Sequence, residues 1–378
     1  MKNKPLRIGY LSADFQNHPV NHLLYPLYKN HTRPDFMIFA YSFGENDFSS
    51  YRLAVEKGCD RFFDITKLHP LKAAEKIHSD KINILVDLMG YTRNSRPNIL
   101  ALKPAPIQIS YLGYPGTTGS DFIDYIITDP ILTPTNQQKY YTEKFIYIPD
   151  CYQVNHRHAI SKTKYTRKDY NLPEKGIVFA SFNKTGKINP DLFKTWMNIL
   201  LKVENSVLWL SLPTESQQIL NNLKTYSKKY KVNVNRLIFT AKVPLEDHLK
   251  RLQLADLALD TTIYSGGVTT SNALLAGIPV LTLQGKHYLS RMSSSLIHAV
   301  GMDEMVTHSL ADYENLAIKI GNDKALIQNL KQKLKQKVNK SNLYDIKSFT
   351  INIEEAYKVV WEHFAKNLPP KQFVIKAK

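Results

Sequence analysis

The segment from Leu254 to Leu283 constrains the fold more than any other part of the chain. An apolar run ending at Leu259 leads into a turn that contains the adjacent glycines Gly266 and Gly267. A short helix-like stretch then stops at Gly277, and a second apolar run follows. We predict a strand, a glycine turn, a helix and a strand. Such a turn either simply connects two elements or aims free N–H groups and a positive helix end at a phosphate.

The same alternation of strands and helices runs through the rest of the chain. The predicted strands cover residues 6–12, 36–41, 82–88, 107–111, 125–128, 177–182, 206–210, 236–240 and 280–283. The predicted helices include residues 73–80, 192–203, 245–254, 312–338 and 353–364. This spacing is typical of α/β proteins with parallel, doubly wound sheets. The glycine turns follow predicted strands, and ligands of such sheets collect at the carboxyl ends of the strands.

The chain is long enough for two domains, since it has 378 residues. The apolar pattern lapses between Cys151 and Tyr170, which we interpret as a linker. We therefore predict two Rossmann-like domains, residues 1–165 and 166–345, that face a central cleft. A C-terminal helix, residues 346–366, is expected to pack back towards the first domain, and residues 367–378 are expected to form a tail that adds nothing to the core.

Composition narrows the class of partner and the compartment. The net charge of +17 favours anionic partners, but much of it is lysine at helical spacing, and no nucleic-acid-binding motif accompanies it. Nucleic acid is therefore not the expected partner. No apolar run is long enough to span a membrane, and the basic residues 1–5 lead into only a strand-length apolar run, unlike a signal peptide. Two cysteines provide neither a disulfide framework nor metal-ligand spacing, so we expect a cytoplasmic protein.

Candidate binding residues gather in three segments of the second predicted domain. Asn183, Lys184 and Lys187 follow its first strand, where two lysines can meet a diphosphate or can simply be solvated. His248 and Arg251 share one face of a predicted helix. The glycine turn and the helix after it supply the third set, namely Gly266, Gly267, Val268, Thr269, Thr270 and Asn272.

The first domain supplies candidates for sugar or acceptor contacts. His18 follows the first strand and is either a turn residue or an acid, base or sugar ligand. Two further strand-end loops contribute Tyr91, Thr92, Leu112, Gly113 and Pro115. No metal-binding motif occurs, so we expect neither a metal nor another cofactor.

Taken together, these segments resemble the catalytic region of the protein O-linked N-acetylglucosamine transferase and SPINDLY family. The resemblance covers about residues 6–366. It is carried by six ordered motifs, LRIGYLSADFQNHPV at 6–20, ILVDLMGYT at 84–92, KPAPIQISYLGYPGTT at 103–118, DYIITD at 124–129, SFNKTGKINP at 181–190, and the segment 253–279. The resemblance implies a GT-B fold and an inverting, metal-independent transfer of a sugar, most often GlcNAc from UDP-GlcNAc, to Ser or Thr of proteins.

The resemblance also implies roles for individual residues. Lys187 matches the lysine that holds the diphosphate and is needed for activity. His248 and Arg251 match residues around the uridine, and Gly267, Val268 and Thr269 match positions that face the diphosphate. In the first domain His18 matches an active-site histidine near the sugar, while Leu112, Gly113 and Pro115 match the loop beside it.

Departures from the family pattern leave the donor open. Asn272 stands where the animal enzymes carry an aspartate, Gly267 and Val268 replace a His and a Thr, and Leu245 replaces a lysine. GDP-fucose O-fucosyl transfer and UDP-glucose N-glucosyl transfer are therefore alternatives. The family also usually carries N-terminal tetratricopeptide repeats, which help to choose protein acceptors. No such repeats are seen in this sequence, so a separate targeting partner in their place is an alternative. A third alternative is a weakly active subunit that binds a partner of a glycosylation complex.

Overall fold

The computed structural model describes residues 4–212 and 217–378. Residues 1–3, which belong to the basic N-terminal stretch, lie outside the described residues. The chain divides into two compact units, which we call unit 1 (Met1–His156 with Asn342–Lys378) and unit 2 (Arg157–Ser341). The boundary between them after His156 falls within the stretch 151–170, which the sequence suggests as a linker.

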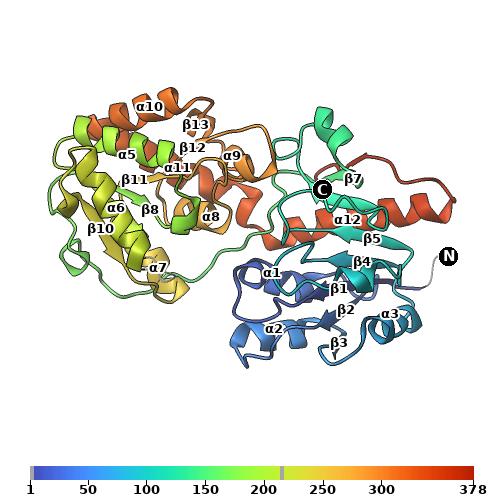
Figure 1. Ribbon diagram of the computed structural model, residues 1–378. Helices are drawn as coiled ribbons and strands as arrows, with labels where there is room; N and C mark the ends of the chain where they lie inside the picture. The colour runs from blue at the N-terminus through green and yellow to red at the C-terminus, as the bar shows by residue number, and fades with distance from the viewer. Residues whose placement is uncertain (1–3, 213–216) are drawn as a thin grey trace. The chain divides into compact units, whose positions relative to one another are not determined.

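Within the described residues, unit 1 is built on an eight-stranded parallel sheet in the order β14-β7-β6-β5-β4-β1-β2-β3. The strands are β1 (Leu6–Ser12), β2 (Phe36–Ser42), β3 (Arg61–Asp64), β4 (Ile84–Asp87), β5 (Ile107–Ser110), β6 (Tyr125–Thr128), β7 (Lys144–Tyr147) and β14 (Phe373–Val374). The helices are α1 (Pro19–Asn30), α2 (Ser50–Gly58), α3 (Pro70–Ser79), α4 (Pro97–Leu100) and α12 (Ile346–Ala365) (Figure 1).

The C-terminal residues pair with the sheet of unit 1, which the sequence analysis did not anticipate. Phe373 and Val374 form β14 beside β7. The ring of Phe373 lies 6.1 Å from that of Tyr125, and Ile375 is buried. Our expectation that residues 367–378 add nothing to the core is wrong, because two residues at a sheet edge leave no periodic pattern in the sequence.

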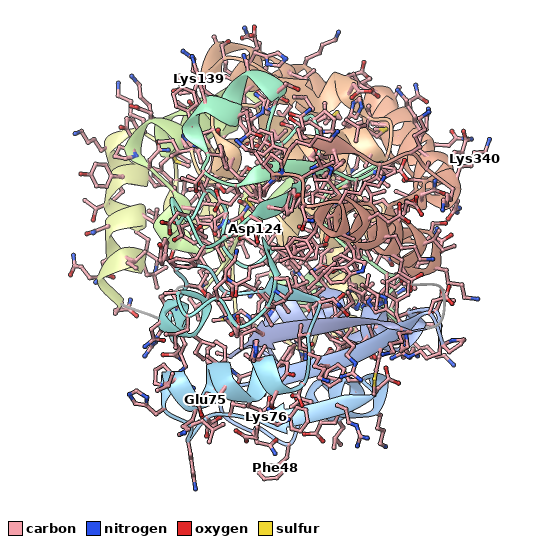
Figure 2. The ribbon with its side chains drawn as sticks, turned by 90° about the vertical axis from the view of Figure 1, so that its right-hand side faces the viewer. Phe48, Glu75, Lys76, Asp124, Lys139 and Lys340 are labelled. Atoms are coloured by element: carbon pink, nitrogen blue, oxygen red, sulfur yellow. The ribbon has the colours of Figure 1, made fainter. Side chains whose placement is uncertain are left out.

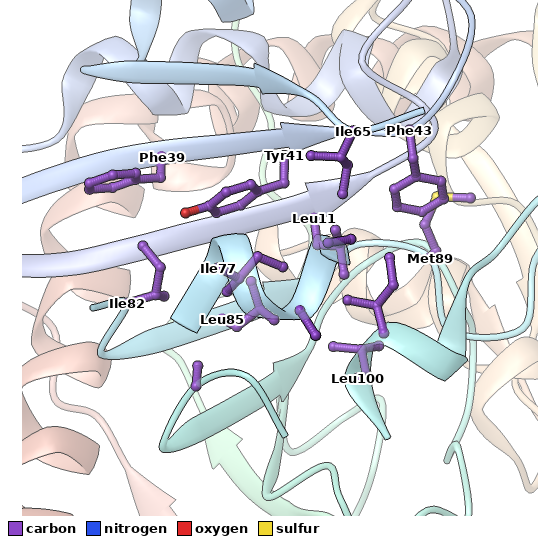
Figure 3. Packing of buried hydrophobic residues seen from close by; sticks show 14 of the residues in the cluster. Leu11, Phe39, Tyr41, Phe43, Ile65, Ile77, Ile82, Leu85, Met89 and Leu100 are labelled. Carbon is purple, nitrogen blue, oxygen red and sulfur yellow. The ribbon is translucent and has the colours of Figure 1, made fainter. Parts of the chain in front are cut away.

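One apolar core of unit 1 fills the space between the sheet and α3. Leu11, Phe39, Tyr41 and Leu85 point from the strands towards Ile77 of α3, as Figure 3 shows. Alternate side chains of a strand point to opposite faces of the sheet, and Phe39 and Tyr41 accordingly share this face.

A buried polar cluster fixes α12 to the first strand and helix of unit 1. Glu354 of α12 accepts hydrogen bonds from the backbone N–H of Thr32 (2.6 Å) and from its hydroxyl (2.9 Å), and it lies 3.0 Å from Nδ1 of His31. The hydroxyl of Tyr10 bonds both His31 and Tyr357. Burial lowers the pKa of His31, although Glu354 opposes this. Burial also opposes ionisation of Glu354, but hydrogen bonds from His31 and Thr32 outweigh it and lower the pKa of Glu354.

Substitution Glu354→Gln is expected to lower the free energy of unfolding by about 1–2 kcal/mol at pH 7, because a charged acceptor of several hydrogen bonds is lost. The folded pKa of Glu354 is below its ordinary value of 4.5. The difference in the free energy of unfolding between wild type and variant should therefore be complete above pH 4.5. It should shrink as the pH falls through the folded pKa of Glu354. Urea unfolding at several pH values measures it, with exposed Glu362→Gln on the same helix as the control. Equal losses in both variants would contradict the expectation.

Unit 2 contains a six-stranded sheet, also parallel, in the order β10-β9-β8-β11-β12-β13 among the described residues. Its strands are β8 (Val178–Ser181), β9 (Val207–Ser211), β10 (Leu237–Thr240), β11 (Leu257–Leu259), β12 (Val280–Leu283) and β13 (Val306–Thr307). Its helices are α5 (Pro190–Lys202), α6 (Gln217–Lys229), α7 (Leu245–Leu252), α8 (Val268–Leu275), α9 (Met292–Ala299), α10 (Leu310–Asn322) and α11 (Lys324–Lys340) (Figure 1).

The helix predicted for residues 312–338 is two helices. Asp323 interrupts it and accepts a hydrogen bond from the backbone N–H of Leu326, which makes it the N-cap of α11. An aspartate at this position satisfies an otherwise unpaired N–H group of the first helical turn. The side-chain cap, and not a loss of apolar periodicity, therefore sets this boundary.

The lysines that dominate the net charge lie mainly at the surface. Lys139 and Lys340 are exposed, and Figure 2 shows their side chains reaching away from the ribbon. Lys333, Lys335 and Lys337 of α11 are likewise exposed, as a solvated helix face requires. In the part of the chain that is described, every helix is too short or too polar to cross a membrane.

Candidate functional site

The candidate residues of unit 2 gather where β8 and β11 end side by side in the sheet. β8 leads into a loop and the short 3₁₀ helix η3 (Thr185–Lys187), whereas β11 leads through the glycine turn into α8 (Figure 1). Because the strands are parallel, both loops lie at the same carboxyl edge. Asn189, which caps α5, joins the loops through a 3.0 Å hydrogen bond from its Nδ2 to Oγ1 of Thr262.

Lys187 reaches from the first loop to the second. Its Nζ donates to the backbone oxygen of Ser265 (3.0 Å) and to Oδ1 of Asn183 (3.3 Å). It also lies 3.8 Å from the ring centroid of Tyr264. Burial lowers the pKa of Lys187 to about 8, against the attraction of Asp260. The amine therefore stays charged at neutral pH but carries little hydration, a state suited to contact with an anion.

Asp260 organises the turn, and the sequence analysis did not select it. Its Oδ1 accepts hydrogen bonds from the backbone N–H of Gly266 (2.8 Å) and from Nδ2 of Asn183 (3.2 Å). Its Oδ2 accepts from the hydroxyl of Thr282 (2.7 Å). Burial raises the pKa of this carboxyl group. Its position directly after an apolar strand was the available signal, since a polar residue there faces the carboxyl edge.

The first turn of α8 is packed tightly around Gly266. A Cβ atom at Gly266 would lie 2.4 Å from Oγ1 of Thr270 and 2.7 Å from Oγ1 of Thr269, so only glycine fits. Gly267 is the N-cap residue of α8, and no side-chain hydrogen bond caps this helix end. The first N–H groups of a helix have no acceptor within it. The turn thus offers backbone donors and a positive helix end to a ligand.

The remaining candidates of α8 and the lysine loop differ in exposure. Thr269 donates a 2.9 Å hydrogen bond from its hydroxyl to Oδ1 of Asn183, which ties α8 to the lysine loop. The hydroxyls of Thr270 and Ser293 lie 2.6 Å apart. Asn272 is buried in the second turn of α8, whereas Lys184 is exposed to solvent.

His248 and Arg251 of α7 lie against the same edge. Nε of Arg251 donates to Nδ1 of His248 (3.2 Å), which leaves the proton of a neutral imidazole on Nε2. Burial and Arg251 lower the pKa of His248 to about 3, so the ring is neutral. Arg251 itself is buried, donates to the backbone oxygen of Ala241 (2.7 Å) and lies 5.1 Å from the ring centroid of Phe182. Arg251 therefore supports the site's structure.

Several of the candidates line one cavity of about 20 Å³. It is lined by the predicted residues Asn183, His248, Thr269 and Thr270, together with Ser181 and Asp260 among others. The structure thus brings together residues from three separate segments of the sequence. Their roles towards a ligand remain predictions.

The candidates of unit 1 lie at the carboxyl edge of that unit's own sheet. β1, β4 and β5 are neighbours and parallel, so the loops after them share this edge. His18 is the N-cap residue of α1, and its side chain is 40% exposed. Its Nδ1 lies 3.3 Å from Oδ2 of Asp14, a partner that the sequence analysis did not select. Burial raises the pKa of Asp14, and His18 opposes this.

The loops after β4 and β5 pack closely on each other. A Cβ atom at Gly113 would lie 1.9 Å from the backbone oxygen of Leu88, and Leu112 has a left-handed backbone (φ 68°). Such conformations are costly outside glycine and concentrate at functional sites. The hydroxyl of Tyr91 lies 3.0 Å from that of Ser120, Thr92 bonds the backbone oxygen of Met89, and Pro115 is half-buried.

A buried carboxylate that the sequence analysis missed anchors the second of these loops. Oε1 of Glu143 accepts from the backbone N–H of Thr118 (2.6 Å), and Oε2 accepts from the hydroxyl of Thr117 (2.6 Å). Glu143 is fully buried. It lies 25 residues beyond Thr118, so no local sequence pattern connects the two.

A sequence profile described as glycosyl transferase family 41 matches residues 1–165 and 161–353. The chain belongs to glycosyl transferase family 41. The predicted resemblance to the O-GlcNAc transferase and SPINDLY proteins is thereby confirmed. Within the residues described, no group of three or more His, Cys, Asp or Glu side chains is arranged to hold a metal ion.

Plant proteins are among the relatives of this family 41 chain. It is 35% identical to an Arabidopsis thaliana protein named probable UDP-N-acetylglucosamine–peptide N-acetylglucosaminyltransferase SEC, over 98% of this chain and 39% of that protein. It is 29% identical to the Arabidopsis SPINDLY protein, over 97% of this chain and 40% of the other. The chain therefore spans about two fifths of the length of these relatives.

Solved structures show the same architecture. A variant of the O-GlcNAc transferase of Thermobaculum terrenum superposes with a TM-score of 0.88 at 28% identity, over 96% of this chain and 69% of that one. The HepE protein of Anabaena, solved with UDP, has a TM-score of 0.57 at 14% identity, over 95% of this chain and 100% of that one, and shows the fold alone. The family 41 chain thus has two parallel α/β domains of the GT-B class, as predicted.

Proposed function

We propose that this chain transfers GlcNAc from UDP-GlcNAc to Ser or Thr hydroxyls of a protein, with inversion and without a metal ion. The observation that carries the proposal is the position of Lys187, whose charged and partly desolvated amine lies beside the glycine turn before α8. The relatives named as UDP-N-acetylglucosamine–peptide N-acetylglucosaminyltransferases support the choice of donor and acceptor.

In the proposed reaction the acceptor oxygen forms a bond to the anomeric carbon while the bond from that carbon to the β-phosphate oxygen breaks. The electron pair leaves with UDP, and the hydroxyl proton passes to a base. Negative charge therefore develops on the diphosphate. The Lys187 ammonium and the N–H groups of the first turn of α8 are suited to stabilise it, since fixed donors need no reorganisation during the reaction.

Other candidate residues of both units have supporting roles in the proposal. His248 presents Nε2–H as a donor to the nucleotide, while Asn183 and Thr269 hold the lysine loop against α8. In unit 1 the imidazole of His18, oriented by Asp14, is the proposed base or sugar ligand. The loops holding Tyr91, Thr92, Leu112, Gly113 and Pro115 are proposed to contact the sugar or the acceptor.

A ligand panel with the purified protein tests the donor. UDP and UDP-GlcNAc are expected to raise the thermal midpoint, since a ligand at 100 times its Kd stabilises the native state by about 2.7 kcal/mol. GDP and GDP-fucose at the same concentrations should produce no comparable shift. Intact-mass measurement of co-expressed proteins should then show N-acetylhexosamine additions, and fragmentation of the modified peptides should assign them to Ser or Thr. A shift with GDP alone, or a different added sugar, would contradict the proposal.

A further inference from the structure

The ring of Tyr264 completes the surroundings of the Lys187 ammonium. An ammonium has three N–H donors. Two are directed to oxygens, at Ser265 (3.0 Å) and Asn183 (3.3 Å), and the ring centroid of Tyr264 lies 3.8 Å from Nζ. The face of an aromatic ring attracts a cation at this distance. The ring of Tyr264 thus lies beside the ammonium in addition to its two hydrogen-bonded oxygens.

The backbone fixes the ring where it lies. Ile263 has a left-handed conformation (φ 65°), and the N–H of Tyr264 bonds back to the oxygen of Thr262 (2.7 Å), which closes a three-residue turn. The oxygen of Tyr264 accepts from the hydroxyl of Thr261 (2.7 Å). Ser265 is held in turn by the oxygen of Leu289 (2.9 Å). Tyr264 is therefore bonded through both of its peptide groups.

The contact depends on the ring face and not on the hydroxyl. Among the residues that the structure describes, none hydrogen-bonds the Tyr264 hydroxyl, and the residue is 39% exposed. Burial raises the pKa of Tyr264, so the phenol is neutral. The ring therefore acts on Lys187 as a neutral, polarisable face.

Two charged groups also face Lys187, and they act in opposite directions. Asp260, at the end of β11, favours the ammonium form, and Lys184, in the same loop as Lys187, disfavours it. Burial is the larger influence and disfavours the ammonium. A ring that attracts the cation without bringing a competing charge holds the ammonium in place and leaves it available to an anion.

We propose that Tyr264 is a positioning residue that holds the protonated amine of Lys187 at the first turn of α8 before the nucleotide arrives. This inference rests on the proposed function only in taking the anion to be the diphosphate of the donor. Tyr264 itself takes no part in bond making or breaking.

Two substitutions of Tyr264 distinguish the effect of its ring face on Lys187 from the effect of its side-chain volume. Tyr264→Phe keeps the face and removes the hydroxyl, whereas Tyr264→Leu keeps much of the apolar bulk and removes the face. The first measurement is the pKa of the Lys187 amine, obtained from pulsed acetylation over a pH series with peptide-resolved mass spectrometry. It requires neither ligand nor activity. The second is the Kd of UDP at pH 7 by calorimetry.

The Leu variant is expected to lower the pKa of the Lys187 amine by about half to one unit, because the ring's attraction for the charged form is lost. The Kd of UDP should rise about three- to tenfold in the same variant. The Phe variant should match the wild type in both measurements.

Opposite results would overturn the proposal. A pKa that rises in the Leu variant would show that the side chain only shields the amine from water. Equal losses in the Phe and Leu variants would assign the effect to the hydroxyl. The proposed function is tested separately, and it fails if the wild type transfers no sugar. The pKa values of the Lys187 amine in the two variants would still show whether Tyr264 positions that amine.

Discussion

Replacing Lys187 with methionine is expected to reduce sugar transfer by about 10²- to 10³-fold, the usual effect of removing one donor that stabilises charge in a transition state. Methionine keeps most of the chain length and apolar contact but removes the ammonium that bonds Ser265 and Asn183. The kcat for UDP-GlcNAc measures the loss. Exposed Lys194 on the neighbouring helix α5 provides the control, since Lys194→Met removes the same charge away from the turn.

Stability measurements distinguish this effect from unfolding. The folded pKa of Lys187, about 8, is below its ordinary value of 10.5. The charged amine is therefore less favourable in the folded protein than in the unfolded chain at neutral pH, and this penalty is relieved as the pH rises from 8 to 10.5. Lys187→Met should accordingly be at least as stable as the wild type at pH 7. A large fall in its thermal midpoint would contradict this.

The same pKa sets the pH dependence of activity. The free enzyme should keep a charged Lys187 below pH 8 and lose it above, so kcat/KM for the donor should fall on the alkaline side with an apparent pKa near 8. This alkaline limb should be absent from the residual activity of Lys187→Met. A limb that persists unchanged in the variant would assign the titration to another group.

The sequence predicts this candidate site because its residues follow apolar runs with the pattern of strands. Lys187 and Gly266 each follow an apolar run that became a parallel strand, and parallel neighbours end at one edge. The pattern predicts that edge without any knowledge of distances. That the lysine loop and the glycine turn lie next to each other on this edge follows from the pairing of β8 with β11, which the sequence does not show.

Side-chain partners brought together by folding were not predictable in the same way. Asp260 and Thr282 are 22 residues apart, Thr118 and Glu143 are 25 apart, and His31 and Glu354 are 323 apart. Each pair is a buried hydrogen bond between elements, and a buried polar group needs its partner. A single sequence shows the polar residues but not the pairing, which depends on strand order and helix packing.

Short elements were lost for a different reason. β14 has two residues, too few for an alternating pattern to emerge. β3 is as long as several predicted strands, but none of its four residues is buried, so it lacks the apolar run that marks them. The pairing of β14 with β7 depends on an open sheet edge formed by residues far earlier in the chain. The contact between the ring of Tyr264 and Lys187 was also not predictable from the sequence, because it depends on the left-handed turn at Ile263.

Replacing Asp260 with alanine is expected to lower both stability and nucleotide affinity. Three donors that now share its carboxylate would lose their acceptor, namely the N–H of Gly266, Nδ2 of Asn183 and the hydroxyl of Thr282. Unpaired buried donors cost about 1–3 kcal/mol each, in part relieved by rearrangement, so we expect a loss of about 2–4 kcal/mol. Urea unfolding measures it, and calorimetry with UDP should show affinity reduced at least about tenfold, or 1.4 kcal/mol.

Asp256 provides a matched control at the other end of the same strand. Its Oδ2 accepts hydrogen bonds from the backbone N–H of Val178 (2.8 Å) and from Arg167 (2.8 Å), away from the glycine turn. Asp256→Ala should therefore lose stability to a similar degree and keep its affinity for UDP. If Asp260→Ala does not fold, Asp260→Asn retains the side-chain size and one acceptor oxygen. Equal losses of UDP affinity in the Asp256 and Asp260 variants would mean that Asp260 supports the fold and has no particular influence on the turn. A loss of UDP affinity that is confined to the Asp260 variant would link the geometry of Gly266 to anion binding.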